Sequence, residues 1–180
     1  MEKAYRETAE HLGLSCEACL DNCCRSYFQH HTYIEWAYLW RGLEACDPAR
    51  RDDFLKRAEE YVQASRAALA AGQRPRLMCP LNENGWCGLY PYRMMICRLH
   101  GVPNRVHMPD GNTREFPGCS TCQELVSRTE HCVALDRTPF YIELAELERE
   151  FLGGSKRRFP RVNLTLAEMI DQGPPDLGRG

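Results

Sequence analysis

Apolar residues recur at helical spacing in two consecutive stretches, residues 31–45 and residues 48–71. Asp47-Pro48 separates them and supplies an N-cap followed by proline at the first helical position. The two stripes consist of Tyr33, Trp36, Ala37, Trp40 and Leu43, then Phe54, Ala58, Tyr61, Val62 and Leu69. We therefore predict two helices whose large apolar side chains form core rather than a cofactor pocket.

The remaining pattern is also helical. Residues 2–12 predict a short helix, and a longer one begins at Thr138-Pro139 and ends at Gly153-Gly154. The stripe of the longer helix is Phe140, Leu144, Leu147 and Phe151. Thr165 and Glu168 form a capping box that opens a last helix at residues 165–171.

No alternating run longer than four or five residues predicts a strand. We expect a mainly α fold, with irregular cysteine-rich, metal-binding loops between the helices. The sequence predicts one small helical domain over residues 1–180, with its core at about 14–152 and a C-terminal tail at 153–180.

Composition and charge exclude several classes of protein. Hydrophobic residues make up 43% of the 180 residues and charged residues 27%, which argues against disorder throughout. The net charge of −2 favours neither nucleic acid nor an anionic membrane as a partner, and the basic run at residues 156–161 is too short to change this. The sequence shows no apolar run long enough to cross a bilayer, and its start lacks the apolar core of a signal peptide. We expect a cytoplasmic protein.

Cysteine is the unusual component, with 11 residues. Such thiols indicate a disulfide framework, a reactive dithiol or a metal site. An odd number fits poorly with a complete set of internal disulfides, and a reducing compartment argues against disulfides more strongly. Metal ligands or catalytic thiols are the better interpretations.

Nine of the cysteines fall into three clusters. Two C-x2-C pairs are present, and such a pair can direct two thiolates at one ion while nearby backbone amides face the sulfurs. The candidate metal ligands are Cys16, Cys19, Cys23 and Cys24; Cys79, Cys87 and Cys97; and Cys119 and Cys122. Nine ligands would serve one or two four-ligand sites. Spacing alone does not distinguish zinc from an iron–sulfur cluster such as [4Fe–4S], because both use tetrahedral thiolate sets.

The same residues resemble a known family. The run C-x2-C-x3-C-C at residues 16–24, Cys79-Pro80, the segment C-G-L-Y-P-Y-R at residues 87–93, and Cys97-Arg98 are similar to the YkgJ-type cysteine-cluster family, described as zinc- or iron-chelating. Met94 stands where the family pattern has a proline. The resemblance implies a metal-binding protein.

Four other residues near the clusters are assigned a supporting role at the cofactor. Arg93 and Arg98 lie close to Cys97 in sequence and would offset the negative charge of clustered thiolates. Trp86 and Tyr90 would shield the site from water. An equally simple interpretation is that all four pack and pair on the surface. Cys46 is expected to be a buried, small apolar side chain, and Cys132 is assigned no role.

Three hypotheses for function remain. The first is a metal-binding protein whose iron–sulfur cluster or zinc serves structure, redox chemistry or metal handling. The second is a metal-dependent enzyme, because longer proteins that methylate flagellin lysines are similar in cysteine pattern, although no catalytic residue stands out. The third is an interaction module in which zinc fixes the loops and the helical surface binds a protein partner.

The first and second clusters are separated by the two predicted helices. They can share one site only if those helices fold into an antiparallel hairpin that brings the chain back. We expect Cys16, Cys19, Cys79 and Cys97 to lie in one metal neighbourhood, with this hairpin above it.

Overall fold

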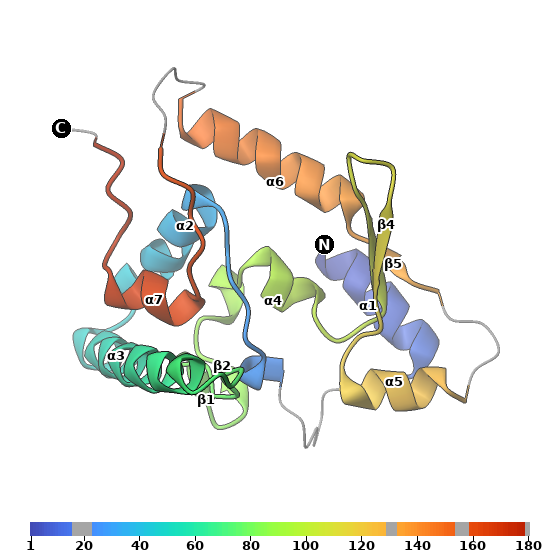
Figure 1. Ribbon diagram of the computed structural model, residues 1–180, viewed down its shortest axis with the longest axis horizontal. Coiled ribbons are helices and arrows are strands. Elements are labelled where there is room, and N and C mark those ends of the chain that lie inside the picture. The colour runs from blue at the N-terminus through green and yellow to red at the C-terminus, as the bar shows by residue number, and fades with distance from the viewer. Residues whose placement is uncertain (16–22, 129–132, 154–158, 179–180) are drawn as a thin grey trace. The chain divides into compact units, whose positions relative to one another are not determined.

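A computed structural model describes residues 1–15, 23–128, 133–153 and 159–178, with Cys23 described by its backbone only (Figure 1). The fold is mainly α, as predicted. The helices are α1 (Glu2–Leu12), α2 (Tyr33–Glu44), α3 (Pro48–Ala70), α4 (Met95–Leu99), α5 (Ser120–Val126), α6 (Thr138–Phe151) and α7 (Leu166–Asp171), with 3-10 turns η1 (Cys23–Arg25) and η2 (Tyr90–Tyr92). The strands are β1 (Asn82–Glu83), β2 (Trp86–Cys87), β3 (Asn104–His107), β4 (Thr113–Phe116) and β5 (Leu135–Asp136). Among the described helices, none is both long and apolar enough to cross a membrane.

The chain divides into two compact units. Unit 1 consists of Met1–Cys23 and Met95–Glu146, and unit 2 of Cys24–Met94 and Leu147–Gly180. The C-terminal residues that the sequence assigns to a tail are therefore part of unit 2, where α7 packs on α3.

The local signals that predict the helices of unit 2 are confirmed. The Asp47 side chain accepts a hydrogen bond from the Arg50 amide at the start of α3, and Thr165 and Glu168 form the predicted capping box of α7. Each cap satisfies an amide that has no partner inside its own helix. The buried face of α3 carries Phe54, Ala58 and Val62, but Leu69 is 49% exposed, so the predicted stripe ends one turn early.

The two tryptophans of α2 hold α7 in place. The indole N–H groups of Trp36 and Trp40 both donate to the Met169 carbonyl at 2.9 Å, and Trp36 also reaches the Gly173 carbonyl at 2.9 Å. The last carbonyls of a helix receive no hydrogen bond from an N–H group of the same helix. The indoles therefore satisfy acceptors that would otherwise need water. This confirms that the tryptophan stripe belongs to the core, with a polar function at its edge.

A carboxylate distant in sequence caps α2. Glu148 accepts hydrogen bonds from the amides of Tyr33 and Ile34, both at 2.8 Å, where Thr32 provides no side-chain cap. A negative charge at this end also complements the helix dipole. The C-terminal part of α6 is thereby fixed to α2 within unit 2.

The predicted antiparallel hairpin of α2 and α3 is wrong. Both helices are described over their full length, yet α3 packs mainly against α7, and α2 packs against η2. Gly42 explains the second contact, because a Cβ there would lie 2.6 Å from the Tyr92 ring. The chain turns at Asp47 as expected, but packing partners far along the sequence decide where each helix lies.

Unit 1 has its own core and a small sheet. Its buried cluster is Ala9, Met95, Leu99, Val102 and Leu135, from α1, α4, β5 and the loop before β3. The sheet has the order β4-β3-β5, with β3 antiparallel to β4 and parallel to β5. In α6, which is described over its full length, no side chain is fully buried. Its predicted apolar stripe is therefore only partly packed, and Leu147 is 43% exposed.

His30 is a buried titratable group in unit 2. Its backbone pairs with Leu164, donating at 2.7 Å and accepting at 3.2 Å, and its side chain is 4% exposed. Burial lowers its pKa from 6.5 to about 4, with a contribution from the neighbouring His31. The folded state therefore binds a proton at His30 less readily than the unfolded chain.

This shift predicts a loss of stability in acid. The neutral histidine contributes about 3 kcal/mol of stability above pH 6.5, which is lost as the pH falls toward 4. Thermal unfolding at several pH values, with bound metal measured at each, should show a smaller acid-dependent fall for His30→Gln than for the wild type. His11→Gln, at an exposed position of α1, should keep the wild-type slope. Equal slopes in all three proteins would contradict the assignment.

Candidate metal centre

The described cysteines are divided between the two units. Cys24, Cys46, Cys79 and Cys87 lie in unit 2, and Cys97, Cys119 and Cys122 lie in unit 1. All seven are free thiols, so the described part of the chain contains no disulfide. Cys16, Cys19 and Cys132 and the side chain of Cys23 lie outside the described residues. The predicted neighbourhood of Cys16, Cys19, Cys79 and Cys97 stays a prediction.

A backbone hydrogen bond joins the first and second cysteine clusters. The Cys79 amide donates to the Cys24 carbonyl at 2.9 Å, although α2 and α3 lie between them in sequence. Nearby, Arg74 Nη2 donates to the Tyr27 carbonyl at 3.0 Å, so the segment after α3 runs beside the segment after η1. The return of the chain that the sequence requires is therefore present, by a route other than a helical hairpin.

Tyr61 on α3 lies near Cys79 and Tyr27. Burial raises its pKa to about 12, and the neighbouring Cys79 and Tyr27 add to the shift. The phenol is therefore protonated at neutral pH and lies close to the Cys79 thiol.

Cys87 lies on a two-residue hairpin next to these thiols. In the antiparallel pairing of β1 with β2, Cys87 is opposite Asn82, whose amide donates to the Cys79 carbonyl at 3.0 Å. Burial raises the pKa of the Cys87 thiol and the neighbouring Cys24 adds to this rise, whereas the Leu89 backbone amide and the Arg93 charge oppose it. Backbone hydrogen bonds thus join the segment of Cys24, the segment of Cys79 and the hairpin that carries Cys87.

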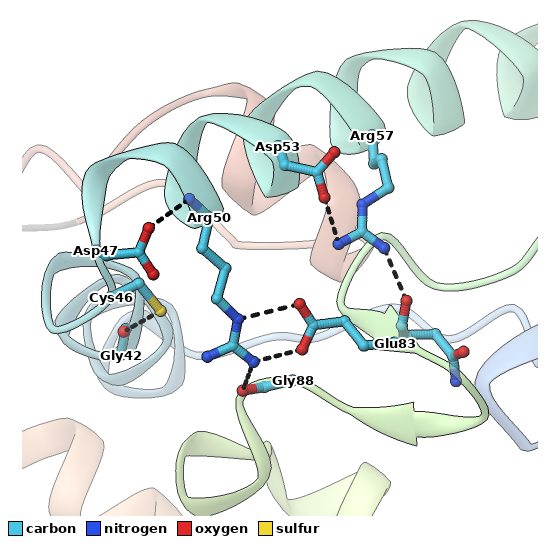
Figure 2. A network of polar contacts seen from close by, with 9 residues as sticks. Gly42, Cys46, Asp47, Arg50, Asp53, Arg57, Glu83 and Gly88 are labelled. Carbon is cyan, nitrogen blue, oxygen red and sulfur yellow. Dashed lines mark hydrogen bonds and ion pairs between the residues drawn. The ribbon is translucent and has the colours of Figure 1, made fainter.

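Arg50 and Glu83 fix this loop to α3 (Figure 2). The Arg50 guanidinium forms a two-point ion pair with the Glu83 carboxylate, with Nε to Oε1 at 3.0 Å, and Nη2 also donates to the Gly88 carbonyl at 2.9 Å. Figure 2 shows the guanidinium between α3 and the hairpin, beside Cys46. One arginine therefore binds both strands of the hairpin that carries Cys87.

A second arginine reinforces the same contact. Arg57 Nη1 donates to the Asn82 carbonyl at 2.7 Å, and Nη2 pairs with Asp53 at 2.9 Å (Figure 2). The guanidinium groups of Arg50 and Arg57 lie 5.2 and 4.9 Å from the centre of the fully buried Phe54 ring. Cation–π contact with both arginines stabilises their orientation toward the hairpin.

Gly88 is required by the closeness of this packing. A Cβ at this position would lie 2.5 Å from Glu83 Oε2 and 2.7 Å from Phe54 Cζ. Any larger residue would therefore separate the ion pair or displace the hairpin. Cys46 takes no part in the thiol group: it is half-buried and donates to the Gly42 carbonyl at 3.4 Å, rather than being the fully buried residue expected.

The C-x2-C pair of unit 1 has the predicted relation between amide and sulfur. Cys119 is the N-cap of α5, and its sulfur accepts a hydrogen bond from the Cys122 amide at 3.4 Å. Cys122 is fully buried, and a Cβ at Gly118 would lie 3.1 Å from its sulfur. The Cys119 amide donates to the Gly101 carbonyl at 3.0 Å. Gly101 follows α4, the helix that carries Cys97, so the pair lies beside the C-terminal end of that helix.

The four predicted supporting residues are separated by the two units. Arg98 lies in unit 1 on α4, whereas Trp86, Tyr90 and Arg93 lie in unit 2. Arg93 stacks on Tyr90, with its guanidinium carbon 3.6 Å from the ring centre. Trp86 is 60% exposed and Tyr90 45%, so both residues lie at the surface of unit 2.

The described residues do not by themselves complete a metal site. No group of three or more histidine, cysteine or acidic side chains with suitable geometry occurs among them. An open cleft of about 650 Å³ lies in unit 2 next to the segment after η1 and is lined by Tyr27, Phe28, Gln29, His31, Leu69, Gly72, Gln73 and Arg74. Sequence reasoning did not predict this cleft or the Arg50–Glu83 pair, since exposed charges on a helix carry no distinguishing pattern.

Comparison with protein-family models, with curated proteins and with solved structures finds no match to this chain. The resemblance to the YkgJ-type family therefore depends on the motif residues alone.

The ion pair predicts a measurable contribution to stability. Arg50→Ala should lower the free energy of unfolding by about 1–2 kcal/mol, because charged hydrogen bonds are lost, with a discount for their partial exposure. Arg66→Ala, which removes an exposed arginine from the same helix, is the matched control and should change it by less than about 0.5 kcal/mol. Urea unfolding measures both, and equal effects would show that the hairpin does not depend on Arg50.

Proposed function

We propose that this protein binds a metal ion or an iron–sulfur cluster through cysteine thiolates, and that Cys24, Cys79 and Cys87 belong to one such site. The observation that carries the proposal is the Cys79-to-Cys24 backbone hydrogen bond, which holds two cysteine clusters together across two intervening helices.

The chemistry of the donors fits zinc or iron. Thiolate is the preferred ligand for both, and amides directed at sulfur stabilise the charge of metal-bound thiolates. The Leu89 amide at Cys87 and the Cys122 amide at Cys119 are such donors. Cys24, Cys79 and Cys87 would be three of the four ligands that a tetrahedral site needs.

The alternative of a reactive thiol is less favourable at Cys87. A nucleophilic cysteine needs a lowered pKa, because the thiolate is the reactive form. Burial instead raises the pKa of Cys87, so the free thiol is protonated at neutral pH. A bound cation reverses this balance and deprotonates its thiol ligands.

The bound group determines what the protein does with the site. Zinc would cross-link the loop and stabilise unit 2, whereas an iron–sulfur cluster would add one-electron chemistry. The protein's own contribution is the same for both: α3, through Arg50 and Arg57, fixes the hairpin that carries Cys87.

The cysteines of unit 1 form a second proposed group of ligands. Cys119 and Cys122 are close in space, and Cys97 lies on α4, whose end contacts that pair through Gly101. Cys16 and Cys19 remain proposed ligands without an assigned partner. Six described thiols divided equally between the units favour two metal sites over one.

The cleft of unit 2 favours a second candidate function. Its volume of about 650 Å³ is within the range of small-ligand sites, and it presents His31 and Arg74 beside Tyr27 and Phe28. A metal-dependent enzyme would need such a cleft near an open metal position. Metal-dependent binding of a small molecule that is lost in Leu69→Trp, a change that fills the cleft, would favour this alternative over a purely structural metal.

Cysteine substitutions test the proposal. Cys79→Ser and Cys87→Ser should each reduce metal affinity by more than the roughly 10–100-fold that loss of an outer hydrogen-bond partner costs, and should lower the melting temperature. Cys46→Ser is the matched control, because its side chain bonds its own helix and it should keep full metal loading. Metal analysis and thermal unfolding after anaerobic purification measure both effects. Full loading of Cys79→Ser and Cys87→Ser would exclude the site.

A further inference from the structure

Arg137 is a buried cation without an anionic partner in the described chain. Its residue is 3% exposed, its Nε makes no hydrogen bond, and no side-chain hydrogen bond or ion pair joins its guanidinium to a described residue. Burial lowers its pKa, and no carboxylate opposes this effect. Buried charges normally have a counter-charge, because removing an ion from water is costly. By contrast, Arg50 and Arg57 both have carboxylate partners.

Two aromatic rings enclose the Arg137 side chain. Its guanidinium carbon lies 4.7 Å from the centre of the Phe116 ring on β4 and 5.8 Å from that of Tyr141 on α6. Both rings are also partly exposed, at 42% and 39%. Cation–π contact offsets part of the cost of burying the charge but satisfies none of its five N–H donors. The rings form apolar walls around a group of unused donors.

The nearest acid in sequence, Asp136, is already engaged. Successive residues of a strand point to opposite faces, so Asp136 and Arg137 diverge at the end of β5. The Asp136 carboxylate accepts from the Thr138 amide at 2.9 Å and lies 3.7 Å from His107 Nε2. The chain therefore places its own carboxylate on the other side of the sheet.

An unused acceptor shares the sheet face with Arg137. Asn104 on β3 is paired with both Phe116 and Leu135, and its side chain is 4% exposed. Its Nδ2 donates to the Val102 carbonyl at 2.9 Å, but its Oδ1 has no partner among the described residues. The Arg137 guanidinium reaches from the β5 side of the sheet to the ring of Phe116 on β4, and β3 with Asn104 lies between these strands. Unused donors and an unused acceptor are thus close together.

From this arrangement we propose that Arg137, Asn104, Phe116 and Tyr141 form a binding site for a carboxylate that carries an adjacent N–H or O–H donor. The carboxylate accepts hydrogen bonds from the guanidinium, and the adjacent donor reaches Asn104 Oδ1. An apolar group on the ligand packs between the two exposed rings. An acylated amino acid and the free end of a peptide chain both have this chemistry. The site is independent of the cysteines and of the proposed metal.

The test uses the full-length protein and N-acetylphenylalanine as the probe. Titration should shift the Nε–Hε NMR resonance of Arg137, and the neutral amide of the same compound should bind about tenfold or more weakly, because the charge-assisted hydrogen bonds are lost. Benzoate, which lacks the adjacent donor, should bind more weakly than N-acetylphenylalanine. An acetylated tetrapeptide ending in the same residue separates the two sources: binding at least as tight indicates a chain end, and much weaker binding indicates a small acid.

Substitution supplies a second measurement. Arg137→Met removes the buried charge, and because it has no Arg137 resonance, calorimetry follows the probe: the variant should lose binding while its melting temperature stays unchanged or rises. Arg105→Met is the matched control, because it removes the same charge from an exposed position on the opposite face of β3, and it should bind normally. An unshifted Arg137 resonance at millimolar probe, equal binding of acid and amide, or a large loss of stability in Arg137→Met would overturn the proposal and indicate a structural arginine satisfied by buried water.

Discussion

The backbone hydrogen bond from Cys79 to Cys24 is the constraint on which the account of unit 2 depends. It brings together two cysteine-bearing segments that α2 and α3 separate in sequence, and it does so through main-chain groups that any sequence could supply. The residues around the Cys87 loop determine where that loop lies. Arg50 and Arg57 bind the loop to α3, and Gly88 lets the loop approach the Phe54 ring. Packing of the hairpin on α3 therefore fixes the position of Cys87.

The sequence predicts the helices well because their signals are local. Asp47-Pro48, the capping box at Thr165 and the tryptophans of α2 each act within a few residues, and the structure has helices where these signals place them. Prediction from the sequence fails where the packing or hydrogen-bond partner of a helix lies far along the chain. Glu148 caps α2 from 115 residues away, and α7 rather than α2 is the main partner of α3, which makes the predicted hairpin wrong. The small sheet of unit 1 was missed because strands of two to four residues are too short to show an alternating pattern.

For the candidate site, sequence spacing proposes the cysteines, and the structure adds the unit to which each described cysteine belongs. The spacing joins Cys79, Cys87 and Cys97 in one cluster, whereas the structure places the first two in unit 2 and the third in unit 1. Arginines close to Cys97 in sequence were expected near the thiols, and the charge of one of them, Arg93, does lower the pKa of the Cys87 thiol. The sequence did not indicate Arg50 and Arg57 on α3, which position the Cys87 hairpin from about thirty residues earlier. Charge pairing across such a separation leaves no trace in a single sequence.

Native mass spectrometry of the wild-type chain, purified without oxygen from iron- and zinc-replete cells, tests the central claim of cysteine-bound metal most directly. We expect a mass above that of the polypeptide by one or two zinc ions or iron–sulfur clusters, and we expect this extra mass to be lost together with the fold when the thiols are protonated in acid. A visible absorption band would accompany the mass of a cluster and be absent for zinc. A folded protein at the bare polypeptide mass, with Cys24, Cys79 and Cys87 open to alkylation, would rule out a cysteine-bound metal.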